Sequence, residues 1–115
     1  MSDNRKTKDP NAVEPFFAIW CNETDGLNDG SANDNGYLQG ETISTSTWTV
    51  DPGLTKDSSD KDAVNIAGVS YDANTVATIW LSGGKVGHTY KCVNRIVTSD
   101  SRTQDKTIYI TIKEN

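Results

Sequence analysis

Few side chains in this sequence are spaced so that they could do chemistry. His88 is the only histidine, and no Ser or Cys motif surrounds it that would make it part of a nucleophilic site. The glycine-rich stretch 83–87 contains a lysine, but it lacks the Gly-x-x-x-x-Gly-Lys-Ser/Thr spacing that cradles phosphate. No sequence motif places a pair of carboxylates where they could act as general acid and general base. We therefore expect a protein that is not an enzyme and that uses no cofactor.

The two cysteines, Cys21 and Cys92, have no Cys or His at the spacing of a zinc site. The chain opens with polar and charged residues and no apolar core follows them, so no secretory signal is predicted and assembly in the cytoplasm is expected. Thiols stay reduced in that compartment. We expect two buried free thiols that pack as small hydrophobic side chains, with a disulfide as the alternative.

The segment 22–40 is rich in Asp, Asn and Gly, which could supply oxygen ligands to calcium. Counted from Asp25, the EF-hand pattern fails, because Leu27 falls on a ligand position and Gly36 replaces the closing Glu. The same residue types are common in long turns, where they tolerate left-handed backbone. We expect a surface loop without a metal ion, and an irregular calcium site is the alternative.

Charge is concentrated in this same segment. The chain has a net charge of −5, and five acidic residues but no Lys or Arg lie between Glu23 and Glu41. The rest of the chain is balanced, which argues against nucleic-acid binding, and no apolar run reaches the length of a membrane span. We expect the acidic loop to project from the body, so that deletion of residues 24–39 leaves the fold intact.

The elements that carry these residues are predicted to be β-strands. Val, Ile and Thr together account for 30 residues, against 4 Leu and 7 Ala, a balance that favours sheets over helices. Residues 1–15 are predicted to form a polar N-terminal arm, either frayed or ordered on docking, and residues 16–115 a β-sandwich with the acidic loop inserted at 22–40. Turn residues separate the predicted strands at 16–21, 41–50, 63–71, 75–82, 89–98 and 107–113.

The order Cys21, Trp48, Tyr90 and Cys92 is typical of an immunoglobulin domain. In that fold the two cysteines face each other across the sandwich, the Trp packs on them, and the Tyr two residues before the second Cys forms the tyrosine corner. These four residues are the predicted structural core. The fold expected is an all-β, immunoglobulin-like antiparallel β-sandwich of about seven strands.

Alternation along the strands predicts that some aromatic side chains face away from the core. If Cys21 faces inward, then Phe16 and Trp20 face outward, and Trp80 does so on a neighbouring strand. An exposed patch of Phe16, Trp20 and Trp80 is typical of a protein interface. The alternative is a shift of one residue, which would turn these side chains inward.

Four segments carry a resemblance to a known family: Thr42–Val50, Ala77–Gly84, Val86–Thr98 and Arg102–Thr107. They resemble the bacteriophage fibre–tail adaptors, small structural proteins, and the acidic insertion resembles that of members from marine short-tailed phages. Lys8-Asp9-Pro10 is similar to the usual opening of the family. The resemblance implies an immunoglobulin-like domain without enzymatic activity.

As implied by the resemblance, the protein is a virion component assembled in the host cytoplasm, which joins tail and fibres by docking and is present in multiple copies. Its partners would be other phage virion proteins of the tail, neck, fibre or capsid. Arg95, with the aromatic patch, is a candidate contact, as is Arg102. Two alternatives remain open: a capsid decoration protein, and a module that binds host-surface glycans through Trp20, Trp80 and the acidic loop.

Overall fold

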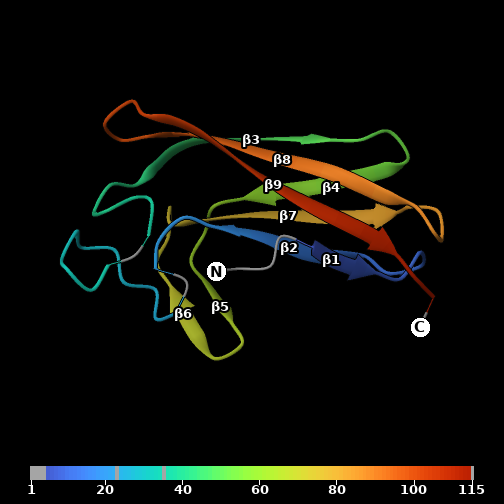
Figure 1. Ribbon diagram of the computed structural model, residues 1–115, viewed down its shortest axis with the longest axis horizontal. Helices are drawn as coiled ribbons and strands as arrows, with labels where there is room; N and C mark the ends of the chain where they lie inside the picture. Colours follow the sequence, from blue (N-terminus) through green and yellow to red (C-terminus); the bar gives the residue numbers. More distant parts are fainter. Residues whose placement is uncertain (1–4, 23, 35, 115) are drawn as a thin grey trace.

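The computed structural model describes residues 5–22, 24–34 and 36–114 of the protein. These residues form nine strands (Figure 1). They contain no helix that is long and apolar enough to cross a membrane. The strands are β1 (Arg5–Lys8), β2 (Glu14–Ile19), β3 (Ile43–Val50), β4 (Leu54–Asp60), β5 (Val64–Ile66), β6 (Val69–Tyr71), β7 (Val76–Gly83), β8 (Thr89–Thr98) and β9 (Thr103–Ile112).

Seven of these strands pack as two layers. One sheet has the order β1-β9-β8-β3 and the other the order β2-β7-β4, while β5 and β6 form a separate hairpin. Strand neighbours are antiparallel except for β1, which runs parallel to β9. The predicted all-β sandwich is therefore confirmed. The orders β2-β7-β4 and β3-β8-β9 correspond to strands B-E-D and C-F-G of an immunoglobulin sandwich.

Two strand predictions differ from the structure. The polar stretch after Leu54, expected to be a connection, is strand β4, and only Leu54 of this strand is buried. Its exposed polar side chains fit its place at the edge of a sheet. The single strand expected over 63–71 is the β5–β6 hairpin, because Ala67 and Gly68 both adopt positive φ and reverse the chain.

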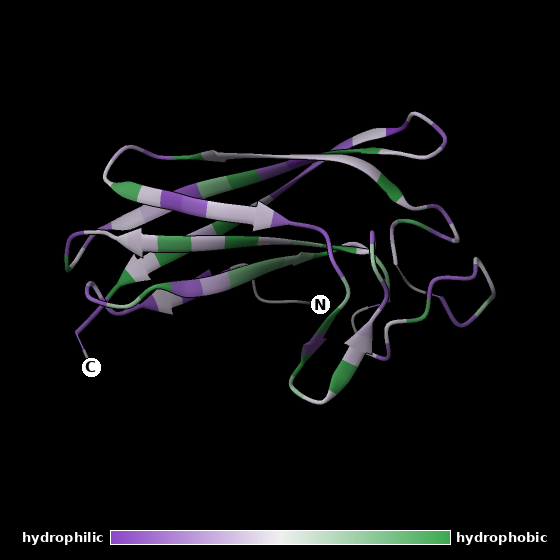
Figure 2. Ribbon diagram, turned by 180° about the vertical axis from the view of Figure 1, so that it is seen from behind, coloured by the Kyte–Doolittle hydropathy of each residue, from purple (hydrophilic) through white to green (hydrophobic). Residues whose placement is uncertain are grey.

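The main core lies between the two sheets, and alternation along the strands fills it (Figure 2). On β8, every second side chain from Tyr90 to Ile96 is buried, as period-two alternation predicts. Trp48, Tyr90 and Cys92 all belong to this core cluster. The Tyr90 hydroxyl accepts the backbone N–H of Lys85 at 3.1 Å, which is the hydrogen bond of a tyrosine corner.

A polar pair crosses this apolar core. The indole N–H of Trp20 donates to the side-chain oxygen of Asn94 at 2.9 Å, and both residues are buried. The amide nitrogen of Asn94 donates in turn to the Ser46 hydroxyl at 2.9 Å and to the Thr47 carbonyl at 3.3 Å. Because its polar atoms are all paired, Asn94 can be fully buried in the core without a large desolvation cost.

A second apolar cluster lies on the other face of the β2–β7–β4 sheet, under the β5–β6 hairpin. Cys21, Tyr71 and Val76 are its buried residues, and Phe17 and Ile19 pack against it. Cys21 therefore does not face Cys92, which lies in the main core. Both cysteines are free and buried. The expected approach of the two cysteines across the sandwich is wrong, because β2 ends at Ile19 and Cys21 follows it into the second cluster.

The expected polar arm is in part a strand. Arg5–Lys8 form β1 along the outer side of β9, and residues 1–4 of that arm lie outside the described residues. Lys8 is buried, and its ammonium group donates to the backbone carbonyls of Asp9 at 2.8 Å and Gly83 at 2.9 Å. Because Gly83 ends β7, this lysine joins the N-terminal strand to the opposite sheet.

Candidate interaction surface

The aromatic patch expected on Phe16, Trp20 and Trp80 is only partly at the surface. Trp80 is 37% exposed, but Phe16 and Trp20 are only 7% and 2% exposed and lie in the main core. The interface role expected for Phe16 and Trp20 is therefore wrong. The inward side chains of β2 are shifted by one residue from the predicted set, which was the alternative. A glycan platform formed by Trp20 and Trp80 together is excluded by the same burial.

The side chains that accompany Trp80 on the outer face are Pro15 and Phe17. In the β2–β7 register, Pro15 lies opposite Trp80, and Phe17 lies opposite Thr78. Pro15 and Phe17 are half-buried. We call Pro15, Phe17 and Trp80 the outer patch. It adjoins the β5–β6 hairpin, whose Ile66 packs in the same cluster as Phe17.

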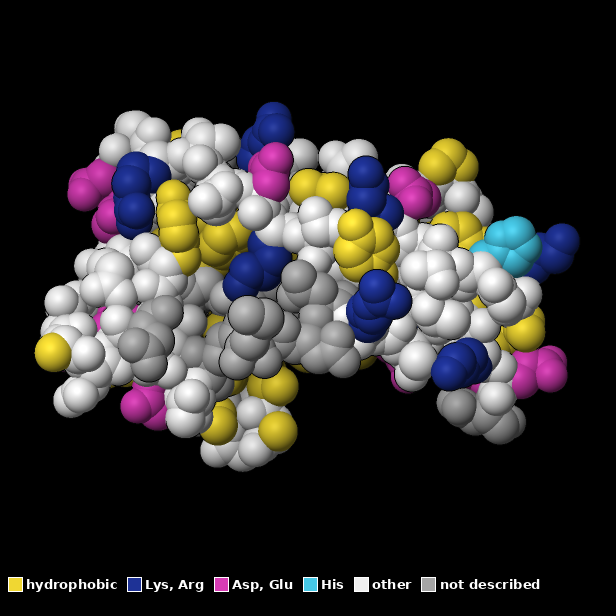
Figure 3. Space-filling model, in the orientation of Figure 1, with side chains coloured by type: hydrophobic (Ala, Val, Ile, Leu, Met, Phe, Trp, Pro, Cys, Tyr) yellow, Lys and Arg dark blue, Asp and Glu magenta, His cyan; other side chains and the backbone are white. Residues whose placement is uncertain are grey.

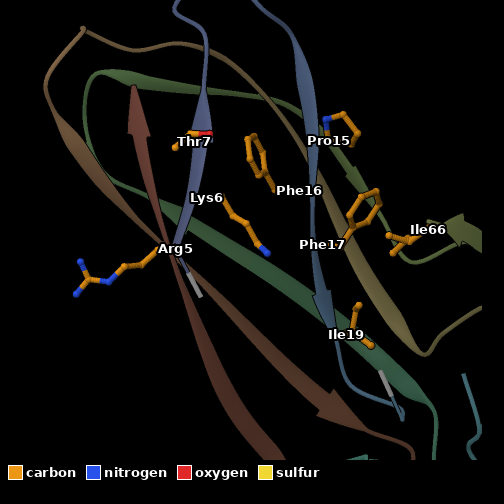
Figure 4. A pocket seen from close by; sticks show the side chains of 8 residues that line it. All are labelled: Arg5, Lys6, Thr7, Pro15, Phe16, Phe17, Ile19 and Ile66. Atoms are coloured by element: carbon orange, nitrogen blue, oxygen red, sulfur yellow. The ribbon is translucent and has the colours of Figure 1, made fainter. Parts of the chain in front are cut away.

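A groove opens between β1 and β2, where the edges of the two sheets come together (Figure 4). Its volume is about 480 Å³. The side chain of Lys6 points into the space between the two strands, whereas Arg5 points away from it (Figure 4). We call this feature the β1–β2 groove; its lining residues are Arg5, Lys6, Thr7, Pro15, Phe16, Phe17, Ile19 and Ile66.

The edge of β2 along this groove carries backbone groups that β7 does not use. The backbone N–H of Trp20 donates to the carbonyl of Thr75. In an antiparallel ladder every second residue of a strand bonds to its neighbour, so Ala18 of β2 bonds to β7 through Ala77. The N–H and C=O groups of Phe17 and Ile19 therefore point away from β7. The ammonium group of Lys106 caps the Ile19 carbonyl at 2.5 Å.

The conformation of the acidic loop is held by one of its own carboxylates. Asp34 is buried, and its two oxygens accept the backbone N–H groups of Asp29, Gly30 and Gly36 at 2.9–3.0 Å. A carboxylate that accepts hydrogen bonds from three backbone amides fixes the conformation of the loop around it, because such charge-assisted bonds are strong. Glu23, at the start of the acidic segment, lies outside the described residues. Within the described residues, no group of three or more His, Cys, Asp or Glu side chains is arranged to hold a metal ion.

Aromatic and basic side chains fasten the same loop to the sandwich. Tyr37 packs edge-on against Trp20, with ring centroids 5.4 Å apart, and Leu38 is fully buried in the main core. The Arg102 guanidinium lies 4.5 Å from the centre of the Tyr37 ring, and Lys106 lies 4.8 Å from that of Trp20. The end of the loop at Tyr37 and Leu38 is therefore part of the core structure, whereas residues 29–33 are exposed and extend beyond the sheets (Figure 1).

The two arginines considered as contacts are both engaged within the chain. Arg102 pairs with Glu41 at 2.5 Å and donates to the Tyr37 carbonyl at 3.2 Å. Arg95 makes two hydrogen bonds to the carboxylate of Asp105, at 2.7 and 3.0 Å, and stays exposed. This pair lowers the pKa of Asp105. Arg95 thus remains available at the surface, whereas Arg102 serves mainly to anchor the acidic loop.

The Glu41–Arg102 pair makes one contribution to stability depend on pH. Hydrogen bonds from Thr98 and then Arg102 lower the pKa of Glu41 from its usual value of 4.5. A group whose pKa is lower in the folded state stabilises the fold above its unfolded pKa, and this contribution is lost as the pH falls through the folded pKa. We expect Glu41→Gln to unfold more easily than the wild type at pH 7, and the difference to shrink below pH 4.5. Urea unfolding at a series of pH values measures this, and a constant difference would contradict it.

Burial raises the pKa of both cysteine thiols, that of Cys92 to about 11, where Asp51 adds to the effect. Both thiols are therefore protonated at neutral pH, and neither is activated as a nucleophile. Buried, unreactive thiols of this kind contribute to packing.

Comparison with known protein families gives a match over most of the chain. The model of the family described as "Podophage GP4 fiber-tail adaptor protein gp77" matches residues 29–111, which is well over half of the chain. The matched range begins inside the acidic loop and includes β3 to β8 and nearly all of β9. No curated protein matches the chain. The resemblance found in the sequence is thus confirmed, and the chain belongs to the podophage fibre–tail adaptor family of gp77.

Proposed function

We propose that this protein is a non-enzymatic adaptor of the virion, which joins a phage tail to its fibres by protein–protein docking. Membership of the fibre–tail adaptor family carries the proposal, because the family name describes a structural junction. The outer patch supports it, since an exposed Trp beside half-buried apolar side chains is typical of docking surfaces. The partners are other virion proteins, and neither nucleic acid nor membrane is required.

In this function the rigid sandwich presents a fixed surface, and affinity comes from burying that surface against a partner. Trp and Arg are the residue types that most often dominate such interfaces. Trp80 is the anchor in the outer patch, and Arg95 is a second contact on the opposite sheet. Adaptors at a symmetric junction are present in several copies, so each contact is repeated around the tail.

Electron cryomicroscopy of the intact particle tests this function directly. We expect density for this chain at the tail–fibre junction, in a few to about a dozen copies per particle, as the closed symmetry of such a junction requires. Quantitative gel analysis of purified particles gives the copy number independently. Location on the head lattice, in hundreds of copies, would show a decoration protein and would overturn the proposal.

Replacement of Trp80 tests the contribution of the outer patch. Trp80→Ala is expected to fold, because this side chain lies outside both core clusters, and to lower incorporation into particles by at least about tenfold. Incorporation is measured by quantitative gel on particles produced with the variant. Tyr109→Ala is the matched control, because Tyr109 is equally exposed, at 40%, on a strand of the other sheet. If only the Tyr109 variant is excluded from particles, the outer patch is not the docking surface.

A further inference from the structure

We propose that the β1–β2 groove is a strand-addition site, where an extended acidic segment of a partner virion protein pairs with the edge of β2 that faces away from β7. This inference rests on the proposed function and assigns to it a binding mode and a chemical class of ligand. Three features of the groove carry it: backbone groups that β7 does not use, an apolar lining and a positive charge.

The backbone of β2 provides the template for an added strand. β2 lies at the edge of its sheet, and Phe17 and Ile19 direct their N–H and C=O groups toward the groove. An exposed row of such groups pairs readily with another extended chain. Two features limit the row: Pro15 has no N–H to offer, and Lys106 already caps the carbonyl of Ile19. The backbone groups of β2 that face away from β7 therefore suit a short added strand centred on Phe17.

The apolar side chains of the groove would receive alternate side chains of that strand. Phe16 lies between β1 and β2, whereas Phe17, Pro15 and Ile66 lie together on the far side of β2 (Figure 4). Successive side chains of a strand point to opposite faces. A strand added to β2 thus sends one set of side chains toward Phe16 and the other toward Phe17 and Ile66. In strand addition, the backbone supplies affinity and such pockets supply specificity.

The charge around the groove selects an acidic ligand. Among the described residues, the charged ones that line it are Arg5 and Lys6, of which Lys6 points into it (Figure 4), although the whole chain has a net charge of −5. Lys106 adds a third positive charge at the end of the β2 edge. On the face shown in Figure 3, Lys and Arg side chains lie in the middle of the molecule as well as at its ends and upper edge. A segment with acidic residues is attracted to this edge, and a basic one is repelled.

The same charges disfavour a second copy of this chain as the occupant. Two copies joined through their β2 edges would bring the Lys6 side chains, both of which point into the groove, toward each other. Like charges placed opposite each other across paired strands are destabilising. Pro15 would also interrupt the ladder on both sides. A partner with acidic residues avoids the charge repulsion and meets only the one Pro15 of β2.

Selection from a library of random twelve-residue peptides displayed on mRNA identifies the ligand chemistry. We expect the purified protein to enrich peptides in which apolar residues alternate with polar ones and in which acidic residues exceed basic ones. The affinity of one enriched peptide is then measured by fluorescence polarisation. Lys6→Glu is expected to weaken binding about tenfold, because it reverses a charge in the groove. Lys85→Glu is the matched control, since Lys85 is also exposed but lies in the β7–β8 turn, outside the groove, and should change affinity less than about twofold.

N-methylation of the enriched peptide tests strand pairing itself. Only alternate residues of an added strand direct their N–H groups to β2, so methylation in one register should abolish binding, and methylation in the other should leave it unchanged. Equal effects in both registers, or an affinity that is insensitive to Lys6→Glu, would overturn the proposal. Failure to enrich any peptide would overturn it as well.

Particle assembly separates failure of this inference from failure of the proposed function. We expect the Lys6→Glu variant to be depleted from the tail–fibre junction and Lys85→Glu to be present at the wild-type level. If both variants reach the junction equally, the groove is not a docking site but the adaptor function stands. If the wild type is located elsewhere in the particle, the adaptor function fails, whatever the peptides show.

Discussion

Trp20→Ala is expected to destabilise the protein by about 3–5 kcal/mol, the usual cost of removing a large buried aromatic side chain. Trp20 is only 2% exposed and contacts three different parts of the structure. Its indole N–H pairs with Asn94, its ring packs against Tyr37, and Lys106 lies over its face. The loss therefore combines a cavity, an unpaired buried amide and a loosened loop. Urea unfolding monitored by circular dichroism measures the change in the free energy of unfolding.

Trp20→Phe separates the hydrogen bond from the packing. This variant keeps an aromatic ring but leaves the side-chain oxygen of Asn94 without its donor in the core, which should cost about 1–3 kcal/mol. Trp80→Ala serves as the comparison, because Trp80 is exposed and donates no hydrogen bond in the core. If Trp20→Ala and Trp80→Ala destabilise the protein equally, the burial of Trp20 described here is wrong.

Deletion of residues 24–39 is expected to abolish folding at 37 °C. The segment carries Leu38, which is fully buried, and Tyr37, which covers Trp20. Its removal leaves the end of the core near Trp20 exposed to water. This expectation reverses the one from composition alone, which treats the acidic loop as dispensable. One-dimensional proton NMR of the shortened protein, with dispersed amide signals as the criterion for folding, decides between them.

A single substitution tests the same point without changing the chain length. Leu38→Ala should lower the free energy of unfolding by about 2–5 kcal/mol, as for other fully buried Leu side chains. Leu27→Ala is the matched control in the same loop, because Leu27 is only half-buried and belongs to neither apolar cluster. A folded deletion variant, or equal effects of the two Leu substitutions, would show that the loop is an accessory.

The sequence was most informative where only one face of a strand is buried. On β8, the large side chains Tyr90, Cys92 and Ile96 fall on one face, and burial alternates from Thr89 to Thr98, so both the strand and its inward face could be predicted. The spacing of Tyr90 and Cys92 likewise predicted a tyrosine corner, and the hydrogen bond from Lys85 completes it. These features depend on local period and on one well-defined motif.

The register of β2 could not be predicted for a clear physical reason. Both of its faces are apolar, because the main core covers one face and the β5–β6 hairpin helps to cover the other. Alternation then gives no preference between the set with Phe16 and the set with Phe17, and a shift of one residue exchanges them. The predicted interface depended on the register of β2. Trp80 is therefore exposed as predicted, whereas Phe16 and Trp20, predicted beside it, are buried.

Long-range packing explains the remaining differences. Within the acidic loop, nearby backbone amides donate hydrogen bonds to Asp34. The loop is attached to the sandwich, however, through contacts of Tyr37 with Trp20 and Arg102, which lie outside the loop. Such contacts cannot be predicted from a local sequence pattern. A possible signal was the presence of Tyr37 and Leu38, two large side chains within an otherwise small and polar segment.

The pairing of β1 with β9 has a mechanical consequence. The two strands run parallel, with Arg5 opposite Tyr109 and Lys8 opposite Ile112. A force that pulls Arg5 and Ile112 in opposite directions acts along the strands, so it loads all of their hydrogen bonds together in shear instead of breaking them one by one. Lys8 adds a bond from this pair to the opposite sheet at Gly83. The β1–β9 pair thus resists tension along its strands, as the proposed junction between tail and fibre would require.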